Sequence, residues 1–153
     1  MKKLCIAPCG KTKIWSKDPK AGPTPAKDVY IGPFASACRR YAEHFYPNSY
    51  MILSAKYGLL APNDKVPDDY NVTFNDPSTN PITVDQLKKQ VDKKGLRKYD
   101  YIVVLGGRRY VDILEKAFIG KKIINPLEGC SGNGEMMSVL LQAIQLNKPL
   151  GDC

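Results

Sequence analysis

An unbroken apolar run at residues 101–105 (YIVVL) places the strongest limit on how this chain can fold. A strand with apolar residues at consecutive positions is buried on both faces, whereas a strand with one wet face alternates apolar and polar residues. The pair Gly106-Gly107 ends the run. A strand of this kind needs helices on both sides of its sheet, so the run predicts an α/β fold.

Further apolar runs alternate with helical patterns along the chain. Thr83 followed by Gln86 has the capping-box spacing, which marks the start of one helix. The predicted strands are 4–7, 50–53, 101–105 and 121–124, and the predicted helices are 34–45, 83–98, 110–118 and 135–146. This order predicts one domain over residues 1–153, a Rossmann-like three-layer sandwich with a mainly parallel sheet of four to five strands.

Two segments, 9–32 and 61–82, contain many Pro and Gly residues and no clear periodicity. Both are longer than the usual connection of about 4–6 residues, so we predict long functional loops. Within the first segment, Trp15 stands between Lys13 and Lys17. We expect this indole to be exposed, where it can stack on a base.

The formal net charge is +8, from 23 lysines and arginines against 15 acids. Residues 1–27 hold seven lysines, and a second basic cluster covers 88–98. Such an excess favours a polyanionic partner, nucleic acid above all, although a lysine-rich solvated surface is the plain alternative. No apolar run reaches the length of a membrane span, and the first one is too short for a signal peptide, so we expect a cytoplasmic protein without a membrane partner.

Cysteine and histidine usage argues against a metal centre. The five cysteines include no Cys-x-x-Cys pair, and the chain has a single histidine, His44. A closed zinc site needs four such ligands at suitable spacing. We therefore predict reduced thiols, no metal and no cofactor.

Four polar, glycine-containing loops follow the predicted strands, at 9–13, 54–58, 106–110 and 128–134. The carboxyl ends of parallel strands share one edge of the sheet, so these loops should meet there. Lysines, arginines and the free N–H groups of helix starts suit a phosphate. The alternative is that each glycine only turns the chain. The predicted phosphate- or nucleic-acid-binding residues are Lys11, Lys13, Lys56, Tyr57, Gly58, Tyr70, Gly106, Gly107, Arg108 and Tyr110.

Three residues are the candidates for catalysis. Asp28 and Asp69 lie in predicted loops, where a carboxylate can activate water, although Asp69 can equally cap a turn. Ser54 stands beside Lys56 at a strand end, as a candidate nucleophile or as a turn residue. The thiol of Cys9 has no histidine placed to act as its base.

The sequence SAKYGLLAP at 54–62, with YNVTF at 70–74, is similar to the LS-x-x-YGLL-x-P…PY motif of peroxide-stress YaaA-like proteins. It resembles more closely a group of small uncharacterised bacterial, archaeal and phage domains that carry SAK-[YH]-GLL. The segments 7–13 and 25–30 resemble further motifs of those groups. The resemblance implies an α/β fold, a link to DNA or damage tolerance and, in some relatives, nucleobase or modified-nucleoside chemistry. The site residues that it implies are Lys13, Asp28, Tyr30, Ser54, Lys56, Tyr57, Gly58 and Tyr70.

The leading hypothesis is a protein that binds nucleic acid or a nucleotide at the carboxyl edge of its sheet. It would process a base or an N-glycosidic bond there, as a glycosylase does, with Tyr57 or Tyr70 stacked on the base and Asp28 or Asp69 moving the proton. One alternative is a non-catalytic DNA-binding module of a stress response. The other is a small-molecule enzyme that acts on a nucleotide or sugar phosphate.

Overall fold

Four parallel strands form most of the sheet, so their carboxyl ends share one edge. The computed structural model describes residues 2–151. The strand order is β4-β3-β1-β6-β7, and the short edge strand β4 alone runs antiparallel to its neighbour. The strands are β1 (Lys3–Pro8), β3 (Tyr50–Ser54), β4 (Gly58–Leu60), β6 (Tyr101–Val104) and β7 (Lys122–Ile124).

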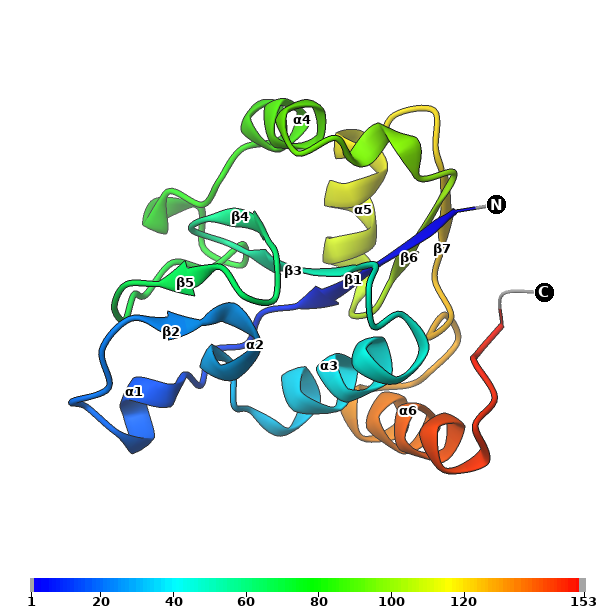
Figure 1. Cartoon of the computed structure of the whole chain (residues 1–153), viewed down its shortest axis with the longest axis horizontal. Helices are drawn as coiled ribbons and strands as arrows, with labels where there is room; N and C mark the ends of the chain where they lie inside the picture. The colour runs from blue at the N-terminus through cyan, green and yellow to red at the C-terminus, as the bar shows by residue number, and fades with distance from the viewer. Residues whose placement is uncertain (1, 152–153) are drawn as a thin grey trace.

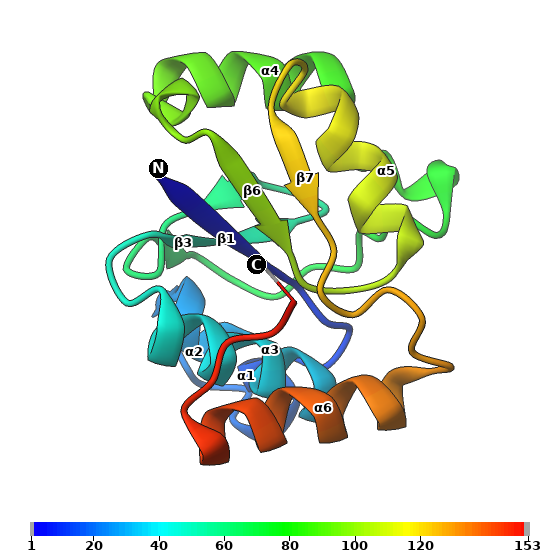
Figure 2. The same ribbon diagram turned by 90° about the vertical axis from the view of Figure 1, so that its right-hand side faces the viewer.

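Helices cover both faces of this sheet (Figure 1). One face carries α1 (Ile14–Lys17), α2 (Ala26–Val29), α3 (Pro33–Phe45) and α6 (Asn133–Leu146), and the other carries α4 (Val84–Lys93) and α5 (Arg108–Ala117). Figure 2 shows the sheet between these two helical layers. The arrangement confirms the predicted α/β sandwich with a mainly parallel sheet.

Alternate residues of each central strand enter the two cores. Cys5 and Val103 face α3 and α6, whereas Leu4, Ile6 and Ile102 face α4 and α5. Each of these side chains is at most 1% exposed, so burial on both faces explains the unbroken apolar runs. The amphipathic helices complete each core with their apolar stripes.

The segments 9–32 and 61–82 are more structured than the sequence predicts. The first contains α1, β2 (Thr24–Pro25) and α2, and the second contains β5 (Lys65–Val66) and the 3₁₀ turn η1 (Pro77–Thr79). Strands β2 and β5 pair antiparallel and so join the two segments. Elements this short depend on a distant partner and leave no periodic pattern in the sequence.

Trp15 is buried, so the expectation of an exposed indole is wrong. Its side chain is 8% exposed and belongs to the core shared with α2, α3 and α6, and its Nε1–H donates to the Ala21 carbonyl at 2.6 Å. A single hydrogen-bond partner is enough to satisfy the polar end of a buried tryptophan. The neighbouring lysines gave a misleading impression of the local exposure.

The helix that begins after Thr83 starts as predicted and ends early. The Gln86 N–H donates to Thr83 Oγ1 at 3.1 Å, and the Thr83 N–H donates to Gln86 Oε1 at 2.9 Å, which completes a capping box. α4 ends at Lys93, and Gly95 adopts a φ of 68° before the 3₁₀ turn η2 (Leu96–Lys98). A glycine in the left-handed region is the common way to end a helix.

Candidate functional site

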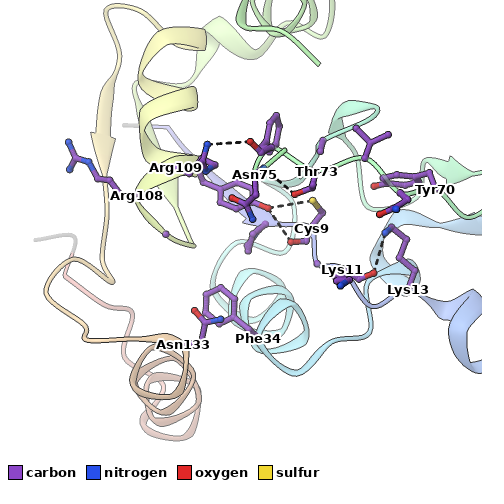
Figure 3. Close-up of a pocket in the computed structure, with 18 residues that line it drawn as sticks. Cys9, Lys11, Lys13, Phe34, Tyr70, Thr73, Asn75, Arg108, Arg109 and Asn133 are labelled. Atoms are coloured by element: carbon purple, nitrogen blue, oxygen red, sulfur yellow. Dashed lines mark hydrogen bonds between the residues drawn. The ribbon is translucent and has the colours of Figure 1, made fainter. Parts of the chain in front are cut away.

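A cavity of about 590 Å³ opens at the carboxyl edge of the sheet, where the four predicted loops meet. Each loop contributes at least one lining residue, and the segment 70–75 forms a further wall. Figure 3 shows Arg108 and Arg109 on one side of the cavity and Lys11 and Lys13 on the other, with Cys9 and Thr73 between them. The lining comprises Pro8, Cys9, Gly10, Lys11, Lys13, Phe34, Ala55, residues 70–75, residues 107–110 and Asn133.

Three helices begin at this cavity, and all three have glycine as the N-cap. The caps are Gly32 for α3, Gly107 for α5 and Gly132 for α6, and none makes a side-chain hydrogen bond to its first turn. α4, which does not line the cavity, carries the full capping box instead. The first N–H groups of a helix have no intrahelical acceptor and carry partial positive charge. Their convergence makes the cavity attractive to an anion.

The side chains reinforce this positive character. Lys11, Lys13, Arg108 and Arg109 line the cavity, and no Asp or Glu stands among the described residues of its wall. Arg109 Nη1 donates to the carbonyl oxygen of Phe74 at 3.2 Å, which ties α5 to the 70–75 segment. The guanidinium of Arg108 contacts Asp112 at 3.1 Å, one helical turn along α5.

Lys13 is the one buried cation of the group, with 7% of its surface exposed. Its Nζ donates to the Lys11 carbonyl at 3.2 Å and lies 4.4 Å from the centre of the Tyr70 ring. Desolvation lowers the pKa of Lys13, and the nearby carboxylate of Asp69 and the Cys9 thiol oppose that shift. A lysine in this setting loses its proton more readily than a solvated one, and a bound anion would favour its charged form.

A chain of hydroxyl groups holds Tyr70 in place. Ser54 Oγ accepts the N–H groups of Lys56 at 3.2 Å and Tyr57 at 3.1 Å. With both lone pairs engaged, Ser54 gives its proton to Tyr70 Oη at 2.8 Å. Tyr70 Oη lies 2.5 Å from Tyr30 Oη, and desolvation raises the pKa of Tyr30 to about 12 and that of Tyr70 further. All three hydroxyls therefore stay protonated near neutral pH.

Cys9 and Tyr110 form a second polar pair in the cavity. Tyr110 Oη donates to the Cys9 carbonyl at 3.2 Å and lies 3.5 Å from Cys9 Sγ. Because the phenol proton is already used, the thiol is the donor in the second contact. Desolvation raises the pKa of Tyr110, and its ring meets Phe74 edge to face at 5.9 Å.

Six of the ten predicted binding residues line the cavity: Lys11, Lys13, Tyr70, Gly107, Arg108 and Tyr110. Gly106 does not line the cavity; its φ is 130°, and a Cβ added there would lie 3.4 Å from Tyr110 Cδ2 and 3.5 Å from Pro8 Cβ. Lys56 is exposed, with Nζ 5.6 Å from the centre of the Tyr70 ring. Tyr57 and Gly58 shape the adjacent turn: the Tyr57 carbonyl accepts Gln90 Nε2–H at 2.9 Å, and the Tyr57 ring contacts that of Tyr70.

The three predicted catalytic residues lie outside the cavity wall. Ser54 is fully buried and reaches the cavity through Tyr70. Asp69, which precedes Tyr70 in the chain, is exposed, and its Oδ1 accepts the Tyr70 N–H at 2.9 Å. Asp28 is exposed on α2, and its charge acts on Tyr50 at the start of β3, away from the cavity. Their roles in catalysis stay predictions.

Sequence reasoning missed Phe34, Asn133 and most of the segment 71–75. Phe34 and Asn133 stand in the first turns of α3 and α6, and each follows a glycine cap by one or two residues. A glycine directly before a helical pattern was the available signal. The segment 71–75 gave no periodic signal, because its place depends on the bonds made by Tyr70 and Arg109.

Two further properties of residues 2–151 bear on function. No group of three or more His, Cys, Asp and Glu side chains in this part of the chain is arranged to hold a metal ion. Within the same residues, none of the helices has the length and apolarity needed to cross a membrane.

Comparison with known proteins assigns a family. Residues 6–142, which include every lining residue of the cavity, match a family of unknown function, DUF6884. The uncharacterised protein YfjM of Bacillus subtilis (strain 168) is 44% identical over 147 residues, which cover 95% of this chain and 97% of that protein. No solved structure is significantly similar. Because the family match spans most of the chain, this protein belongs to DUF6884.

Proposed function

We propose that the cavity binds the phosphate-bearing part of a nucleotide, either free or within a nucleic acid strand. The observation that carries this proposal is the convergence of three glycine-capped helix starts on a cavity that also holds Lys11, Lys13, Arg108 and Arg109. Backbone N–H groups at helix starts together with cationic side chains are the usual protein ligands of phosphate.

The rest of the wall suits a nucleoside. Phe34, Tyr70, Phe74 and Tyr110 offer aromatic surface, and three asparagines offer paired donors and acceptors. Aromatic rings stack on bases, and amide groups pair with base edges. A volume of about 590 Å³ lies within the range of about 300–1,000 Å³ that small-molecule sites occupy. The resemblance of residues 54–62 to motifs linked with DNA and nucleobase chemistry supports the same class of ligand.

Calorimetric titration with the common nucleoside 5′-monophosphates and with the matching nucleosides tests this proposal. A charge-assisted hydrogen bond contributes about 1.5–3 kcal/mol, so the monophosphate of a given base should bind at least about tenfold tighter than its nucleoside. Lys13→Met should remove most of that difference. Lys65→Met, on the exposed strand β5, is the matched control and should change nothing.

Two results would contradict phosphate recognition. One is a nucleoside that binds as tightly as its monophosphate, and the other is Lys13→Met protein that keeps full affinity. If none of the monophosphates binds, the cavity does not serve this class of ligand.

Hydrolysis of an N-glycosidic bond is a second candidate, and Lys13 is the observation that favours it. Desolvation lowers the pKa of its ammonium group, and its place in the wall would let the amine, once it has lost its proton, take a proton from water. The oxygen of the resulting hydroxide would bond to C1′ as the glycosidic bond breaks, and the Lys13 ammonium would return the proton to the departing base. Chromatography of nucleosides and damaged oligonucleotides after incubation should show free base with the wild type and none with Lys13→Met.

A further inference from the structure

A second basic surface lies at the opposite edge of the sheet, where the parallel strands begin. It collects seven of the chain's 23 lysines and arginines but two of its 15 acids, Asp92 and Asp100. We call it the amino-edge surface. Its cations are Lys2, Lys93, Lys94, Arg97, Lys98, Lys121 and Lys122.

Hydrogen bonds show that these residues are neighbours in space. The Asp100 N–H donates to the Lys2 carbonyl at 2.9 Å, and the Lys122 N–H donates to the Asp100 carbonyl at 3.3 Å. Lys121 Nζ donates to the Arg97 carbonyl at 2.6 Å. The starts of β1, β6 and β7 therefore form one surface with η2 and the end of α4 (Figure 2).

The two acids do not neutralise this surface. The Asp92 carboxylate pairs with Arg97, and Asp100 Oδ2 accepts the backbone N–H of Lys2 at 3.3 Å. Lys93, Lys94, Lys98 and Lys122 are exposed. Much of the chain's net charge of +8 is therefore concentrated on one edge, which raises the local attraction for a polyanion.

We propose that the amino-edge surface binds the phosphate backbone of a nucleic acid duplex, as a site separate from the cavity. β1 spans six residues between the two edges, which is about 20 Å at the usual rise per residue, so a ligand in the cavity does not cover this surface. A membrane is the poorer partner. Surface-bound helices bury a broad apolar face. The exposed large hydrophobic side chains of the described chain are Ile119, two residues before Lys121, and Leu146 in α6, and one isoleucine is not such a face.

The test is fluorescence anisotropy with a 20-base-pair DNA duplex across a salt series. Each phosphate contact contributes about −0.9 to the slope of log affinity against log salt. The triple variant Lys94→Gln, Lys98→Gln, Lys122→Gln should make that slope less negative by up to about 2.7. The control variant Lys17→Gln, Lys65→Gln, Lys148→Gln removes the same charge from exposed positions elsewhere and should keep the wild-type slope. Circular dichroism checks that both variants are folded.

Three outcomes would overturn the inference. The first is a wild type that does not bind the duplex at low salt, and the second is equal salt slopes for the two triple variants. The third is that the amino-edge substitutions weaken binding to phosphatidylserine vesicles and leave duplex binding unchanged. Lys13→Met separates this site from the cavity, because the bases of an intact duplex are paired and do not enter the cavity. It should weaken binding of free mononucleotides and leave the duplex salt slope unchanged. If Lys13→Met loses mononucleotide binding and keeps the wild-type duplex slope, the two sites are independent.

Discussion

Gly58→Ala should destabilise the protein through both backbone strain and a steric conflict in the turn before β4. Gly58 has a φ of 79°, and an added Cβ would lie 2.7 Å from Gln90 Nε2, closer still to Gln90 Oε1, and 2.7 Å from Ile82 Cδ1. The Gln90 amide bridges this turn, since Oε1 accepts the Leu59 N–H at 2.8 Å and Nε2 donates to the Tyr57 carbonyl at 2.9 Å. An alanine therefore strains the backbone and displaces the amide.

The magnitude follows from these two effects. A left-handed conformation costs an L-residue about 1–2 kcal/mol. Each lost hydrogen bond adds about 0.5–1.5 kcal/mol, so the total loss in free energy of unfolding should be about 2–5 kcal/mol. Gly95→Ala is the matched control, because its φ is 68° and nothing lies within 4 Å of an added Cβ, so it should show the backbone cost alone.

Equilibrium unfolding in urea measures these differences, and Gln90→Ala separates the two contributions. In the Gln90→Ala background the hydrogen bonds and the clash with the amide are already gone. Gly58→Ala should then cost the backbone strain of about 1–2 kcal/mol, as Gly95→Ala does, plus the smaller cost of moving the end of the Ile82 side chain. Strict additivity of Gly58→Ala and Gln90→Ala, or a cost of Gly58→Ala no larger than that of Gly95→Ala, would refute the reasoning.

Three further predictions concern alkaline stability, helix capping and thiol reactivity. Tyr30 has a folded-state pKa raised to about 12 against an ordinary value of 10.0, so its contribution to stability is full below pH 10 and is lost as the pH rises through 12; Tyr30→Phe should flatten the fall in unfolding free energy measured across this window. Thr83→Ala removes one half of the capping box and should lower the unfolding free energy in urea by about 1 kcal/mol, whereas a loss below about 0.3 kcal/mol would count against the cap. Among the described cysteines, the half-buried Cys9 and Cys130 should react with iodoacetamide in the native protein. The buried Cys5 and Cys38, whose pKa burial raises, should react after unfolding, and mass spectrometry of the labelled peptides distinguishes the two groups.

The sequence was sufficient to predict the frame of the fold. The runs at 4–7, 50–53, 101–105 and 121–124 each overlap a strand, although β6 ends at Val104 and β7 begins at Lys122. Burial on both faces explains the unbroken apolar pattern of the central strands. The capping box at Thr83 could also be predicted, since its two hydrogen bonds join residues that are three positions apart. The meeting of the four loops followed from parallel topology alone.

The details of the site depend on contacts between distant residues. β4 has three residues and pairs with β3 across a turn that Gln90, more than thirty positions away, holds in shape. Trp15 is buried because α1 joins the core that α2, α3 and α6 form on one face of the sheet, which neighbouring lysines do not reveal. The 70–75 wall of the cavity depends on bonds from Tyr70 and Arg109. None of these contacts has a local pattern that sequence reasoning could detect.

The glycine caps at the cavity also bear on how mutagenesis of this protein should be interpreted. The donors that they leave available are backbone amides, which no side-chain substitution removes. An alanine scan of the wall would therefore leave part of the anion recognition in place and would underestimate the site. Substitution of the side chains around these amides could change which ligand the cavity selects. The backbone N–H groups would still bind an anion. Proline substitutions at first-turn positions, which delete the N–H group itself, are the changes that would test the backbone contribution directly.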